Sequence, residues 1–244
     1  MRIGVIGTGP IGTTLTRKLS AGGHDVAVAN SRGPETIDAE TLEFGAHAAT
    51  ADDAVHDKDV VVLSVPFGRI PAVAALFTSV PNETVVIDTS NYFPHLSGAI
   101  EAVDNGQVES LWVTEQLGRP VVKAWNAVLS ETLQTKGVPV GTPGRIALPV
   151  AADSDEARRV GMSLVDETGF DPLDAGVLAF SWRQQPMTPG YCTELGLDDL
   201  GRALEAADRA ETPRNRDHLL DRFGAFTSTP TLEELVELNR SLHR

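Results

Sequence analysis

The sequence has few of the residues on which several protein classes depend. It has one cysteine in 244 residues, Cys192, which excludes an internal disulfide and is typical of a reducing compartment. Lys and Arg number 20 against 34 Asp and Glu, so the formal net charge is −14. This balance disfavours nucleic acid and anionic membranes as partners. No apolar run reaches the length of a membrane span, and no signal-peptide pattern is seen, so we expect a cytoplasmic protein.

Sequence motifs for metal and hydrolase chemistry are also missing. The six histidines are scattered, with no His-x-x-x-His, Cys-x-x-Cys or carboxylate–histidine spacing, so we predict no metal site. No Gly-x-Ser-x-Gly elbow is present, which leaves hydrolase chemistry without support. No side chain is assigned as catalytic. Lys123 is a candidate proton donor by its position in a predicted strand, but the sequence does not say which way it faces.

The opening of the chain carries the most informative motif. A short apolar strand over residues 2–6 leads into a Gly-x-Gly-x-x-Gly turn, and a helical run over 11–20 follows. Gly7 allows the tight turn, Gly9 lets a pyrophosphate approach the backbone, and Gly12 lets the helix pack close to the strand. The helix N-terminus favours phosphate. The motif therefore predicts a dinucleotide site at Gly7, Thr8, Gly9, Pro10, Ile11 and Gly12.

The end of the second predicted strand indicates which dinucleotide is bound. NAD sites usually have Asp or Glu there, to accept a hydrogen bond from the ribose 2′-OH. This chain has Asn30, Ser31 and Arg32 instead. A carboxylate would repel a 2′-phosphate, whereas a hydroxyl and a guanidinium can bind one. We therefore predict NADP(H), with Asn30, Ser31 and Arg32 as cofactor contacts.

Strands and helices alternate through most of the chain. Continuous β-branched runs over residues 60–65 and 84–88 are typical of buried parallel strands. Helices are expected over 36–44, 70–79 and 153–168, with a loop over 94–98. The pattern predicts an α/β fold: a doubly wound, mostly parallel Rossmann sheet with a small helical C-terminal addition. We expect an NADP-binding Rossmann domain over residues 1–178 and a small C-terminal helical region over 179–244, where residues 208–222 read as a charged, solvated helical surface.

Ligands of open parallel sheets bind beyond the carboxyl ends of the strands. The run over 60–65 is followed by Pro66, so Ser64, Val65 and Pro66 lie at one such end. Asn126 follows the predicted strand over 121–125. We expect these small and polar residues to lie near the nicotinamide and its ribose.

Several segments together resemble a known family. The glycine-rich opening, residues 30–35, Ser64-Val65-Pro66 and Asp174-Ala175-Gly176 are similar to the NADPH-dependent coenzyme F420 reductases. Residues 86–91 and 121–126 also resemble the reductase domain of the related STEAP ferric reductases. The resemblance covers about residues 1–178. It implies hydride exchange between C4 of nicotinamide and C5 of a deazaflavin, with F420 as co-substrate. By motif it also implies cofactor contacts at Thr8, Pro10, Ile11, Ser31, Arg32, Ser64, Val65 and Pro66.

The resemblance ends near Phe180. Trp182, Arg183 and Tyr191 beyond it either line a planar acceptor or plug the sheet by packing. The main hypothesis is an NADP-dependent oxidoreductase acting on F420 or a similar small-molecule acceptor. The alternatives are a non-catalytic NADP(H) sensor and a reductase of a small imine or keto substrate. A homodimer is the commonest soluble oligomer, but the sequence does not indicate the assembly.

Overall fold

The computed structural model describes residues 1–212, 215 and 228–243. Its main feature is a six-stranded sheet in the order β3-β2-β1-β4-β5-β6, with all neighbouring strands parallel. This is the classical dinucleotide-binding order, with its switch point between β1 and β4, and it confirms the predicted doubly wound fold. The strands are β1 (Arg2–Ile6), β2 (Asp25–Ala29), β3 (His47–Ala48), β4 (Val60–Leu63), β5 (Val85–Asp88) and β6 (Val122–Lys123).

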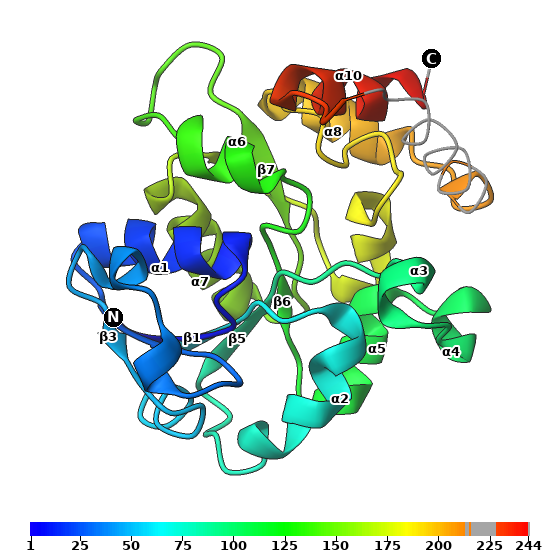
Figure 1. Ribbon diagram of the computed structural model, residues 1–244. Coiled ribbons are helices and arrows are strands. Elements are labelled where there is room, and N and C mark those ends of the chain that lie inside the picture. The colour runs from blue at the N-terminus through cyan, green and yellow to red at the C-terminus, as the bar shows by residue number, and fades with distance from the viewer. Residues whose placement is uncertain (213–214, 216–227, 244) are drawn as a thin grey trace.

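Both faces of the sheet are buried, which explains the continuous apolar strands. Along β4, Val60 and Val62 belong to one core cluster, whereas Val61 and Leu63 belong to another. Side chains alternate across a strand, so a strand covered on both sides needs apolar residues at every position. Helices α1 (Pro10–Ala21) and α7 (Asp155–Glu167) lie on one side of the sheet. Helices α2 (Ile70–Val73) and α5 (Glu109–Leu117) lie on the other (Figure 1).

The helices predicted over residues 11–20 and 153–168 are present as α1 and α7. Helix α7 begins at an N-cap, Ser154, whose hydroxyl accepts a hydrogen bond from the Ala157 N–H. The helices are α1 (Pro10–Ala21), α2 (Ile70–Val73), α3 (Pro94–Ser97), α4 (Glu101–Asp104), α5 (Glu109–Leu117), α6 (Ser130–Thr135) and α7 (Asp155–Glu167).

Three local predictions were wrong. Residues 36–44 form no continuous helix, because Ile37 is extended and buries its side chain in the core between two short 3-10 segments. The helix expected over 70–79 is split into α2 and a tighter 3-10 turn, Ala74–Phe77. The loop expected over 94–98 is the one-turn helix α3, which begins at Pro94 and ends at Gly98 in a positive-φ conformation.

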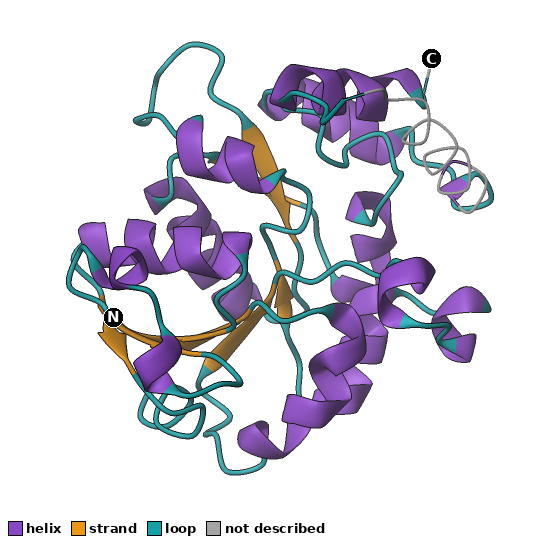
Figure 2. Ribbon diagram, in the orientation of Figure 1, coloured by secondary structure: helices purple, strands orange, loops and turns teal. Residues whose placement is uncertain are grey.

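The C-terminal part continues from the edge of the sheet. Strand β7 (Ala147–Val150) pairs in parallel with β8 (Asp171–Asp174), and an antiparallel bridge between Lys123 and Ala151 joins this pair to β6. Helix α8 (Leu197–Glu205) packs on β7 and β8, and α10 (Leu232–Ser241) begins with a capping box at Thr231. Figure 2 shows this helical end beside the sheet. A domain boundary at residue 178 stays a prediction.

Two further expectations concern the surface. Most of the charged stretch 208–222 lies outside the described residues. Within the parts of the chain that the structure describes, no helix combines the length and the apolar character that a membrane span needs.

Candidate active site

The turn after β1 is shaped by its glycines. Gly7 has a φ of +113°, and a Cβ there would lie 2.1 Å from the Ser64 carbonyl oxygen. A Cβ on Gly12 would lie 2.1 Å from the carbonyl oxygen of Gly7. Gly9 differs, because a Cβ there would meet no atom within 4 Å. The fold itself therefore requires Gly7 and Gly12, whereas the open space at Gly9 suits the close approach of a pyrophosphate.

Among the described residues, no side chain caps the N-terminus of α1. Its N-cap is Gly9, Pro10 follows, and the first turn holds no acidic residue. The N–H groups of a first helical turn have no partner within the helix, and the helix dipole favours an anion beside them. This end of the 12-residue helix α1 can therefore take the phosphates of a dinucleotide.

The three predicted contacts at the end of β2 differ: one side chain forms hydrogen bonds within the loop, and two are exposed to solvent. The Asn30 amide donates to the Thr36 hydroxyl at 3.0 Å, and its oxygen accepts from the Arg32 N–H at 2.8 Å. Asn30 therefore fixes the shape of the loop. The side chains of Ser31 and Arg32 are exposed, and no ion pair to Arg32 occurs among the described residues. A guanidinium in this position is available for a 2′-phosphate.

The end of β4 lies against the glycine turn. The Ser64 N–H donates to the Ile6 carbonyl at 2.8 Å, and the Val65 side chain lies 3.4 Å from the position of a Cβ on Gly7. Ser64 and Val65 are half-buried, and Pro66 is exposed. The structure thus brings the predicted residues of β1 and β4 together at the switch point.

A cleft of about 930 Å³ borders the same turn. Its described lining includes Thr8, Gly9 and Pro10, then follows α1 through Arg17 and Lys18 toward α6. The residues predicted at the ends of β2 and β4 lie outside it. This cleft therefore meets the predicted cofactor site only at the glycine turn.

The ends of β5 and β6 are closed and charged. Lys123 is fully buried, and its ammonium donates to the Asp88 carboxylate at 2.8 Å and also to the Ser90 carbonyl oxygen. Asp88 is also fully buried, and its other oxygen accepts from the Ser90 hydroxyl. Lys123 therefore serves as a buried ion-pair partner, which gives no support to its candidacy as a proton donor.

Asn126 is covered rather than exposed at the sheet edge. Its side chain is 1% exposed, its amide donates to the Gln184 carbonyl at 2.8 Å, and its oxygen accepts from the Gln184 amide at 3.0 Å. Asn91 completes this group, since its amide donates to the Asn126 carbonyl. A contact from Asn126 to the cofactor stays a prediction, and it requires the side chain to exchange one of these partners.

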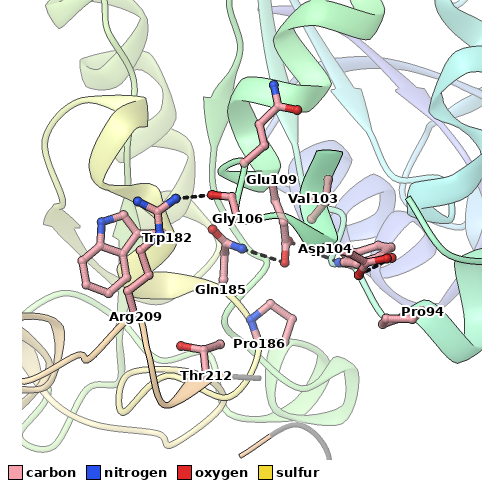
Figure 3. Close-up of a pocket in the computed structure, with 12 residues that line it drawn as sticks. Pro94, Val103, Asp104, Gly106, Glu109, Trp182, Gln185, Pro186, Arg209 and Thr212 are labelled. Carbon is pink, nitrogen blue, oxygen red and sulfur yellow. Dashed lines mark hydrogen bonds between the residues drawn. The ribbon is translucent and has the colours of Figure 1, made fainter. Parts of the chain in front are cut away.

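The bulky residues after Phe180 have different positions. Tyr191 belongs to a small packed cluster with Cys192, and burial raises the pKa of the Cys192 thiol to about 12. Trp182 lies under two guanidiniums, those of Arg183 at 5.5 Å and Arg209 at 5.9 Å from the ring centroid. Tyr191 therefore packs as a plug, whereas Trp182 lines a cavity (Figure 3).

Comparisons with known proteins agree with this geometry. The model of the family "NADP oxidoreductase coenzyme F420-dependent" matches residues 2–92. Protein YjhV of Escherichia coli K12 is 42% identical over 106 residues, which are 43% of this chain and 77% of that protein. The crystal structure of the hypothetical protein SMa0349 from Sinorhizobium meliloti is 31% identical over 76% of this chain and 89% of that chain, with a TM-score of 0.63. The chain belongs to the F420-dependent NADP oxidoreductase family.

This membership confirms that the chain is an NADP-dependent oxidoreductase and binds NADP(H). A crystal structure of a candidate F420-dependent NADP reductase from Arthrobacter sp. FB24 has the same fold. It is 20% identical and covers 75% of this chain and 87% of that chain, with a TM-score of 0.57. The family model ends at residue 92, so it says nothing of the helical end of the chain.

One buried acidic residue of this oxidoreductase could not be recognised from the sequence. Glu109 is 3% exposed and begins α5 beside the closed end of β5. Burial raises the pKa of its carboxyl to about 7. In the sequence it looks like any acid in the first turn of a helix, so no local signal distinguishes it.

Proposed function

We propose that this chain transfers a hydride from NADPH to coenzyme F420 or a similar flavin-like acceptor. The main observation that supports this proposal is the uncapped N-terminus of α1 at the glycine turn, beside the exposed Ser31 and Arg32. The turn supports pyrophosphate binding, and the two side chains support a preference for the 2′-phosphate. The family supports the choice of a deazaflavin acceptor.

The proposed reaction takes one hydride and one proton. Hydride leaves C4 of the nicotinamide and forms a C–H bond at C5 of the deazaflavin, while a proton is added at N1 and NADP⁺ is released. For hydride transfer between two bound substrates, proximity and orientation supply most of the rate enhancement. The protein's part is to hold the pyrophosphate at Gly9 and the nicotinamide end near Ser64 and Val65.

An acceptor screen tests this proposal. Purified protein is supplied with NADPH and, separately, with F420, FMN and a simple imine, and oxidation of NADPH is followed in each. We expect turnover with F420 and little with FMN or the imine. No turnover with F420 over a range of pH would exclude that acceptor. Turnover with the imine alone would instead favour a reductase of a small imine or keto substrate.

A further inference from the structure

A cavity of about 450 Å³ lies away from the glycine turn, between the connection from β5 to α5 and residues 182–186. Tyr92 lines it. Figure 3 shows Asp104, Trp182 and Arg209 in its walls. This volume is in the range that holds a small organic molecule. Glu109 and Gln185 line it as well, and their side chains are hydrogen-bonded to each other.

The carboxylate of Glu109 has hydrogen-bond partners, but no described residue forms an ion pair with it. Its oxygens accept from the Gln185 amide at 2.9 Å and from the Tyr92 N–H at 3.2 Å. Among the described residues, no cation lies within ion-pair distance of it. Lys123 attracts its charge, but that ammonium is already paired with Asp88. A buried carboxylate in this position is costly when ionised, and a bound cation would compensate it.

Three other polar groups at the cavity are hydrogen-bond acceptors. No donor among the described residues reaches Gln185 Oε1, which is buried. The Asp104 carboxylate accepts from the Tyr92 hydroxyl at 2.9 Å, and the Gly106 carbonyl accepts from Arg209. Arg209 is exposed and fixed over the Trp182 ring, so its charge lies at the rim together with the exposed Asp104. A donor-rich ligand complements such a lining.

We propose that this cavity binds a small molecule carrying a protonated nitrogen, an amine or an iminium ion. The Glu109 carboxylate is its counter-charge, and Gln185 Oε1 accepts a second hydrogen bond from it. Trp182 already holds a guanidinium over its ring, which shows that this wall accommodates positive charge. The inference does not depend on which molecule accepts the hydride, because its evidence lies in this cavity alone.

Calorimetry on the unaltered protein tests the proposal directly. The probes are benzylammonium, its neutral analogue benzyl alcohol and its anionic analogue benzoate. Because the carboxyl of Glu109 has a pKa of about 7, it is mostly protonated at about pH 6 and must release its proton when the cation binds. We expect benzylammonium binding at about pH 6 to release nearly one proton to the buffer. The affinity for benzylammonium should rise about tenfold from about pH 6 to about pH 8.

Other charged groups around Glu109 are Asp88, Lys123, Asp104 and Arg209, and the neutral phenol of Tyr191 is a further titratable group. Substitution separates their effect from that of Glu109. Glu109→Gln removes the charge and keeps the shape, and we expect it to weaken benzylammonium binding more than tenfold and abolish the proton release. Glu101→Gln, an exposed acid on the adjacent α4, is the matched control and should change neither.

Three results would overturn the proposal. They are equal binding of benzyl alcohol and benzylammonium, no proton release from the unaltered protein, and unchanged affinity in Glu109→Gln. NADPH binding by Glu109→Gln serves as the check that it folds. If that variant does not fold, the proton release and the preference among the three probes, both measured on the unaltered protein, decide the question.

Discussion

The two ends of this sheet edge handle charge in opposite ways. At the glycine turn, no described side chain caps the N-terminus of α1, and the exposed Arg32 has no ion pair among the described residues. At the ends of β5 and β6, Asp88 and Lys123 are fully buried and paired, and Glu109 lies beside them. The open end can bind an anion without losing an internal bond. The closed end depends on every one of its partners, so changes there act first on stability.

The buried pair should give the largest effect. Lys123→Met leaves the Asp88 carboxylate buried without its partner, and we expect the free energy of unfolding to fall by about 3–5 kcal/mol. Urea unfolding measures it. Lys136→Met is the matched control, since the Lys136–Glu194 pair is partly exposed and should contribute at most about 1 kcal/mol. Similar decreases in the free energy of unfolding of the two variants would show that the buried Lys123–Asp88 pair contributes no more to stability than a partly exposed ion pair.

Glu109 should make stability depend on pH. Its pKa is raised from 4.5 to about 7 in the folded protein, so the fold binds its proton more tightly than the unfolded chain does. Its contribution is fully present below about pH 4.5 and is lost as pH rises through about 7, a decrease of about 3 kcal/mol. Urea unfolding at several pH values measures this decrease. Glu109→Gln should flatten it, and an unchanged pH profile in that variant would contradict the assignment.

Substitution should distinguish Gly12, which the fold requires, from Gly9, which we expect only the cofactor to require. Gly12→Ala places a methyl group against a backbone oxygen and should lower the free energy of unfolding by about 3 kcal/mol or more. Gly9→Ala meets no atom, so stability should stay within about 1 kcal/mol while NADPH binding weakens. Thermal unfolding and cofactor titration of both variants measure these effects. Normal NADPH affinity in Gly9→Ala would show that no phosphate approaches there.

Substitution of Arg32 should change the free energy of NADPH binding and leave the fold unaffected. Arg32→Ala should weaken NADPH binding by about 1.5–3 kcal/mol and leave NADH binding nearly unchanged, because only NADPH has the 2′-phosphate. Fluorescence titration with both nucleotides measures the difference. Arg2→Ala is the control, since Arg2 pairs with Asp59 at the far end of β1. Equal losses for the two nucleotides would show that Arg32 does not contact that phosphate.

The open end could be predicted from the sequence because its elements are close together along the chain. The glycine turn, α1 and the end of β2 lie within 32 consecutive residues, and glycine spacing reports backbone geometry directly. The closed end joins Asp88, Glu109, Lys123 and Gln185, which no local pattern connects. Asn126 shows what the sequence alone could not predict. Its position after β6 was predicted, but its cover by Gln184 comes from 58 residues away.

The bare N-terminus of α1 also has a consequence for the speed of binding. The chain has a net charge of −14, and NADPH is itself an anion, so the long-range field of the protein repels the molecule it must capture. The helix dipole acts only within a few ångströms, after that repulsion has been overcome. Added salt screens the repulsion first, since the Debye length is about 8 Å at physiological ionic strength. Moderate salt should therefore speed the encounter with NADPH, the reverse of its effect on proteins that attract their ligands from a distance.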